Sequence, residues 1–167
     1  MIKSMVSFLE VFIKWIGYLA AFSLAMLVVL VVYDATARYL FHSGSIALQE
    51  LEWHLFDVVI MLGIAYTLQR ASHVRVDIFY DRYSDKTRHM VNILGLLFFI
   101  LPFSTLIIYV GFDFVMISFS QMEASSDPGG LSYRFIVKSL LPLSFVLLIM
   151  QTLVEIYSEF NALKALK

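Results

Sequence analysis

WIGYLAAFSLAMLVVLVVY, residues Trp15 to Tyr33, is an apolar run without a charged side chain. Three similar stretches follow, at Leu55 to Leu68, Met90 to Phe112 and Ser139 to Val154. Crossing about 30 Å of hydrocarbon takes roughly 20 helical residues. A helix is the natural form for such runs, because it satisfies its own backbone where lipid offers no hydrogen bonds. The sequence therefore predicts an all-α integral membrane protein with four transmembrane helices.

The second stretch is the least regular of the four. Asp57 interrupts its start, and the clean run from Val58 to Leu68 is too short to cross a bilayer alone. A helix that begins near Leu48 reaches spanning length, with charged and polar residues in its interfacial turns: Glu50, Glu52, His54 and Asp57. No sequence is left for a fifth span. We expect one domain, residues 1–167, with spans at about 11–33, 48–69, 89–112 and 135–157.

Composition supports the membrane class and excludes several functions. Hydrophobic residues make up 60% of the chain and aromatic residues 16%, and the mean hydropathy is +0.84. A formal charge of -1 gives no reason to expect a nucleic-acid partner. Because the chain has no cysteine, it has no disulfide, thiolate metal site or cysteine nucleophile. The first apolar run is too long for a cleavable signal, so we expect a retained first helix.

Orientation is predicted from the positions of Lys and Arg, which are enriched in cytoplasmic loops. If the N-terminus lies inside, only Arg38, Arg134 and Lys138 fall outside. The other nine of the 12 basic residues are then cytoplasmic: Lys3, Lys14, Arg70, Arg75, Arg82, Lys86, Arg88, Lys164 and Lys167. We therefore expect both termini in the cytoplasm.

The span centres exclude some functions. Residues near Met26, Met61, Phe99 and Phe145 are aliphatic or aromatic, and no repeat relates the two halves of the chain. A secondary transporter normally places polar or ionisable groups near the midplane, often on broken helices in repeated halves. We therefore expect that the chain does not carry a solute by itself.

A membrane anchor for a redox enzyme is the alternative function. A haem held inside a helical bundle needs two facing histidines. The last two spans have no histidine in their interiors, and the four histidines lie near the ends: His42, His54, His73 and His89. We expect no cofactor.

Small residues on the first span form a candidate packing ridge. Gly17, Ala21 and Ala25 recur every four residues, which lets another helix approach closely. The ridge fits packing within the bundle as well as contact with another subunit, and Trp53 is a second candidate for contact with another subunit. Pro102 should kink the third span, because it lacks an N–H and its ring crowds the preceding turn.

Two connecting segments carry further signals. Between the second and third spans, charges alternate with apolar residues, as in a segment that lies along phospholipid at the membrane surface. An ordinary cytoplasmic loop explains that pattern equally well. On the other side, Asp127-Pro128-Gly129-Gly130 is a strong turn signal. This turn is either a docking point for a soluble partner or a tight connector.

Several motifs resemble one transporter family. They are RYLF at 38–41, QELEWHLF at 49–56, GIAYTL at 63–68, HVRVDIFY at 73–80 and DPGGL at 127–131, followed by Tyr133 and Arg134. Over nearly its whole length the chain resembles the small membrane subunit, or Q component, of tripartite ATP-independent periplasmic (TRAP) transporters. The most specific part is the run at the expected cytoplasmic interface: His73, Val74, Arg75, Val76 and Asp77.

The resemblance implies a non-catalytic subunit of a three-part uptake system in the bacterial inner membrane. A soluble periplasmic protein captures an organic acid, a large membrane subunit moves it with sodium, and the small subunit scaffolds the large one. Because the chain ends at Lys167 without a second module, we expect the large subunit to be a separate polypeptide. Candidate residues for transient docking of the binding protein are those expected outside: Arg38, Glu50, Glu52, Asp127, Arg134 and Lys138.

Overall fold

The computed structural model describes residues 2–70 and 83–166, which form helices and connecting segments without a strand. The helices are α1 (Ile2–Phe41), α2 (Ile46–Gln69), α4 (Asp85–Gly95), the π-helical turn η1 (Leu96–Ile100), α5 (Leu101–Ser120), α6 (Phe135–Lys138) and α7 (Leu140–Ala165). Four helical segments are long and apolar enough to cross a membrane: Lys3–Phe41, Ile46–Gln69, Asp85–Ser120 and Phe135–Ala165. The predicted all-α architecture with four such helices is confirmed. The expected interfacial segment, with its motif at 73–77, lies outside the described residues.

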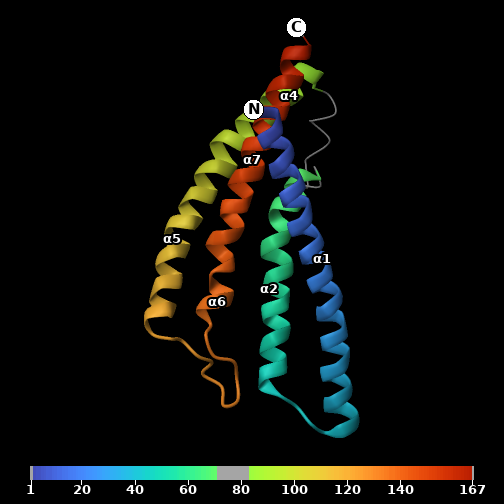
Figure 1. The fold of residues 1–167 in the computed structure, drawn as a ribbon, viewed down its shortest axis with the longest axis vertical. Coiled ribbons are helices and arrows are strands. Elements are labelled where there is room, and N and C mark those ends of the chain that lie inside the picture. The colour runs from blue at the N-terminus through green and yellow to red at the C-terminus, as the bar shows by residue number, and fades with distance from the viewer. Residues whose placement is uncertain (1, 71–82, 167) are drawn as a thin grey trace.

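The long helices stand side by side in one row, in the order α5, α7, α2, α1 (Figure 1). The helices α2 and α7 form the middle of the row and pack on each other, while α1 and α5 form its edges. Both chain termini lie at one end, which we call the terminal end. The segments 42–45 and 121–134 lie at the opposite end, which we call the loop end. At most 33% of the most apolar window of any span is buried within the chain, so most of the row needs another apolar cover.

The helix α1 packs on α2 through a very close approach at Gly17. A Cβ added to Gly17 would lie 2.3 Å from Cγ of Tyr66 on α2, so this position accepts only glycine without a shift. The hydrophobic core beside it combines residues of α1, α2 and α7: Ile13, Ala20, Leu62, Ala65 and Leu147.

The helix α5 approaches α7 through another set of small residues. Ser104, Gly111 and Ser118 are buried and recur every seven residues, so they share one face of α5. A Cβ on Gly111 would lie 3.5 Å from side-chain atoms of Leu141 and Pro142, at ordinary contact distance. Small residues at these positions allow the two backbones to come close, as is common between helices in membranes.

The effect of Pro102 takes the form of a π-helical turn. Pro102 has no N–H to offer the carbonyl of Phe98, four residues earlier. Immediately before it, the N–H of Leu101 bonds to the carbonyl of Leu96, five residues back. The wider turn of η1 joins α4 to α5, which makes one helical segment from Asp85 to Ser120.

Polar side chains tie the helices together at the terminal end. Gln69 Nε2 donates to the carbonyl of Glu10 at 2.8 Å, which connects α2 to α1. Glu159 of α7 accepts from Asn92 Nδ2 at 2.7 Å, and its other oxygen lies 2.5 Å from His89 Nδ1 on α4. These polar contacts lie at the ends of helices whose middle parts are mostly apolar.

Candidate functional site

A cleft of about 490 Å³ with several charged lining residues lies at the loop end. It is bordered by α2, α5, Glu123 of the 121–134 segment, α6 and the start of α7. The lining residues are Glu50, Trp53, His54, Asp57, Met61, Phe114, Glu123, Arg134, Val137, Lys138 and Leu141. Since α6 and α7 stand between α2 and α5, a cleft lined by all of them lies on one face of the row (Figure 1). We call this face the cleft face.

The 121–134 segment folds back on itself beside the cleft, which it lines with Glu123 and Arg134. Pro128 and Gly129 are the central residues of a turn closed by a hydrogen bond from Gly130 N to Asp127 O at 3.0 Å. The φ of Gly129 is 86°, a value that glycine adopts without strain. Gly130 is needed for a different reason, because an added Cβ would lie 2.4 Å from the side chain of Ser125. The predicted turn is thus a compact element fastened to the helices.

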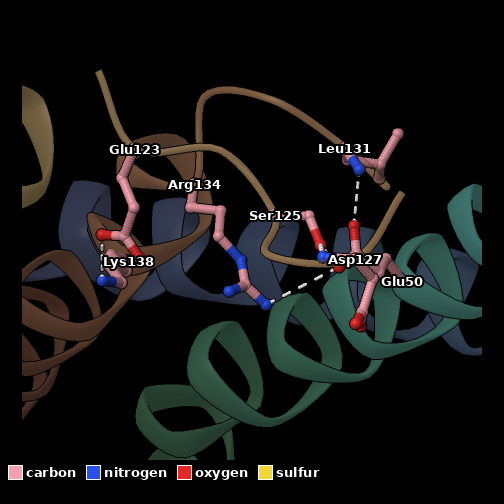
Figure 2. A network of polar contacts seen from close by, with 7 residues as sticks. All are labelled: Glu50, Glu123, Ser125, Asp127, Leu131, Arg134 and Lys138. Carbon is pink, nitrogen blue, oxygen red and sulfur yellow. Dashed lines mark hydrogen bonds and ion pairs between the residues drawn. The ribbon is translucent and has the colours of Figure 1, made fainter. Parts of the chain in front are cut away.

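Glu50 of α2 fastens the turn to the bundle (Figure 2). Its carboxylate accepts hydrogen bonds from Ser125 Oγ and, at 2.5 Å, from the backbone N–H of Leu131. Arg134 Nη2 lies 3.7 Å from Glu50 Oε1. One glutamate therefore satisfies groups from three positions of the 121–134 segment.

A second ion pair closes the base of the segment. Lys138 Nζ donates to Glu123 Oε2 (Figure 2) and lies 4.3 Å from the centre of the Phe114 ring. This ammonium group holds the pKa of Glu123 below the ordinary range of a glutamate. The backbone N–H of Arg134 also donates to the backbone carbonyl of Glu123 at 2.9 Å. The two ends of the segment are thus joined to each other and to α6.

Asp57 lies deeper in the cleft than these pairs. It follows Glu50 by seven residues on α2, which places it about 10 Å farther along the helix at roughly 1.5 Å per residue. Its carboxylate makes no hydrogen bond or ion pair with any described residue. His54, one turn earlier on the same helix, also lines the cleft. Within residues 2–70 and 83–166, no three His, Asp or Glu side chains gather as a metal site.

The structure brings together some of the residues expected to dock a soluble partner. Glu50, Arg134 and Lys138 meet at the cleft, and each is engaged in a contact within the chain. Arg38 pairs with the buried Asp34 on α1 instead. Glu52 does not line the cleft, and its Oε1 is buried without a hydrogen-bond partner among the described residues. Asp127 is exposed in the turn.

The candidates for subunit packing are separated in space. Trp53 lines the cleft and is 68% exposed. Gly17 is buried under Tyr66 of the same chain, whereas Ala21 and Ala25 are exposed on α1. The small-residue ridge therefore serves packing within the bundle at one of its three positions.

Sequence reasoning did not select Glu123, Ser125 or Asp57 as site residues. Asp57 had a usable signal, because a carboxylate that interrupts an apolar span requires a polar environment. Glu123 and Ser125 flank the turn motif, but nothing in their spacing shows that they reach Lys138 and Glu50.

Comparison with known protein families identifies the family of this chain. Residues 27–162 match the model of the tripartite ATP-independent periplasmic transporters, DctQ component. The chain belongs to the DctQ family. DctQ is the small permease component of a TRAP transporter and is not an enzyme. None of the curated proteins shows a significant match to the chain.

Family membership confirms the predicted resemblance and places this DctQ protein in a membrane. DctQ components normally work with a large membrane component, DctM, and a binding protein. The match includes the cleft and the whole 121–134 segment.

Proposed function

We propose that this DctQ protein is a scaffold for the large subunit of a transporter that takes up an organic acid with sodium. The observation that carries the proposal is the single row of helices (Figure 1). A row has two broad faces and, in the part of the chain that the structure describes, encloses no passage through its middle. Such a shape suits a fixed wall beside a moving carrier.

The limited burial within the chain supports the same function. The most apolar window of the segment Asp85–Ser120 is 11% buried, and those of Lys3–Phe41 and Ile46–Gln69 are each 17% buried. Helices in lipid associate through close packing and polar contacts, because lipid tails are as apolar as the side chains they touch. A large subunit that packs on the row would supply the contacts that the chain does not make with itself.

Orientation is part of the proposal. With the loop end in the periplasm of a bacterial inner membrane, the basic residues follow the expected cytoplasmic excess. Asp127, exposed on the fastened turn, is then available to a soluble binding protein. Charges at the edge of an interface mainly set the encounter rate of two proteins, and their effect becomes weaker as the salt concentration rises.

Reconstitution tests this function. We expect sodium-driven uptake in liposomes that contain both membrane subunits and receive the binding protein with its organic acid, and no uptake with DctQ alone. Asp127→Lys should slow uptake, and a higher concentration of binding protein should restore it. Uptake by DctQ alone, or a full rate from the large subunit alone, would contradict the scaffold.

A further inference from the structure

The charges that line the cleft do not balance. Its carboxylates are Glu50, Asp57 and Glu123, and its permanent cations are Arg134 and Lys138. Arg134 lies against Glu50, and Lys138 bonds to Glu123, so both cations are already paired. Asp57 makes no hydrogen bond or ion pair with a described residue; the other lining group that can carry an opposing charge is His54, one turn earlier on α2, and it does not pair with Asp57.

The depth of Asp57 makes an unpaired carboxylate costly. Asp57 lies about 10 Å beyond Glu50 along α2, and only Met61 lines the cleft more deeply on that helix. A charged side chain that faces hydrocarbon is strongly unfavourable, and charged groups within membranes are normally paired. Because the cleft opens on a face of the row, Asp57 requires a partner that covers this face.

The walls of the cleft suit a cation. Trp53 is 68% exposed and Phe114 is 45% exposed, and both border the space that contains Asp57. Phe114 already carries the ammonium of Lys138 over its ring. Aromatic faces attract ammonium and guanidinium groups, and the attraction grows when water is excluded.

We propose that the cleft receives one basic side chain, Lys or Arg, of the large membrane subunit, with Asp57 as its counter-ion. The inference rests on the proposed function and adds that the cleft face binds the partner. A soluble binding protein approaches the loop end from water, whereas Asp57 lies two turns farther into the bundle. The ammonium of a phospholipid lies at the headgroup level, outside the hydrocarbon that the span crosses.

The test measures how fast the membrane complex dissociates. Tagged DctQ is purified with its large subunit, excess untagged DctQ is added, and loss of the large subunit from the tag is followed. Asp57→Asn should dissociate at least about tenfold faster, because a buried cation then loses its partner. Asp57→Glu keeps the charge and should stay closer to the wild type.

Glu10→Gln is the matched control, since Glu10 is exposed on α1 near the terminal end and does not line the cleft. It should dissociate at the wild-type rate, and thermal unfolding of each isolated variant should match the wild type. Equal dissociation of wild type and Asp57→Asn would overturn the inference and leave the scaffold intact. Failure of wild-type DctQ to hold the large subunit would overturn both.

Two further results would assign the cation to another source and overturn the inference. In one, Asp57→Asn keeps the membrane complex but binds the binding protein more weakly. In the other, Asp57→Asn loses a stabilisation that isolated wild-type DctQ gains when phosphatidylethanolamine replaces phosphatidylcholine in nanodiscs. Photo-cross-linking from position 53 adds a direct readout, because the proposal requires a basic residue of the large subunit in the captured peptide.

Discussion

Charged residues at the loop end act mainly as ties between parts of the chain. Glu50 binds a side chain and a backbone N–H of the 121–134 segment, and Lys138 binds Glu123. A charge that is already hydrogen-bonded inside a protein is less available to a partner. Reversal of Arg134 would therefore disturb the contact with Glu50 as well as any docking, which makes Asp127 the cleaner probe of docking.

The Glu123 pair predicts a defined pH dependence. The pKa of Glu123 is lowered by the ammonium of Lys138, so the folded state binds its proton more weakly than the unfolded state does. The resulting stability is present above the ordinary glutamate pKa, about 4.3, and is lost as pH falls through the lowered value. Glu123→Gln should therefore lower the thermal midpoint in detergent at pH 7, and the difference from wild type should disappear in acid.

Asp113→Asn is the control for this measurement, because the exposed Asp113 carboxylate forms no ion pair with a described residue. Its difference from wild type should change little over the same pH range. A constant gap between wild type and Glu123→Gln down to acid pH would show that the ion pair contributes nothing to stability.

At the scale of helices, glycine positions determine how closely neighbours approach. Gly17 and Gly63 both border the groove between α1 and α2. An added Cβ meets the Tyr66 ring at Gly17 and nothing within 4 Å at Gly63. The same substitution at the two sites thus separates packing from helix propensity.

We expect opposite effects on stability from Gly17→Ala and Gly63→Ala. Alanine favours a helix over glycine by up to about 1 kcal/mol, and Gly63→Ala should gain part of that amount. Overpacking costs about 1 to 3 kcal/mol, so the clash with Tyr66 should give Gly17→Ala a net loss. Reversible unfolding in detergent micelles is the measurement. Equal gains from both substitutions would contradict the close approach to Tyr66.

Hydropathy was sufficient to predict the helical elements, but it did not predict how they pack. A long apolar run has few alternatives to a helix in lipid, so even the interrupted second stretch could be recognised. The partner of each face is a matter of side-chain shape, which spacing does not reveal. Gly17 illustrates this, since the ridge pattern fitted two kinds of contact and the position of Tyr66 against Gly17 is known only from the structure.

The site was predicted in part for a similar reason. Asp127 to Gly130 was recognisable as a turn because Pro and Gly have local conformational preferences. The bond from Ser125 to Glu50 joins residues 75 positions apart, and no local rule connects them. Long-range pairs of this kind define the cleft, so candidate charges could be recognised from the sequence but their partners could not.

At the scale of the whole molecule, the row fixes which connections share an end. Segments 42–45 and 121–134 lie together at the loop end, opposite both termini (Figure 1). The basic residues then predict which end is cytoplasmic.

Cysteine labelling tests this topology in a chain that has no native cysteine. A membrane-impermeant reagent added to the periplasmic side should label Ser45→Cys and Ser126→Cys. Ala162→Cys should react only after the membrane is opened, because the terminal end is expected in the cytoplasm. Labelling of Ser126→Cys from the cytoplasm alone would reverse the orientation and with it the proposed side of docking.

The thin row also bears on how the cell must supply this protein. This chain covers little of its own surface. DctQ made in excess of its partner would therefore remain unassembled in the bilayer, with its charged cleft open. Proteases of cellular quality control remove proteins whose assembled state is not populated. Steady levels of DctQ should therefore follow the synthesis of its partner, so that the abundance of one subunit sets the lifetime of the other.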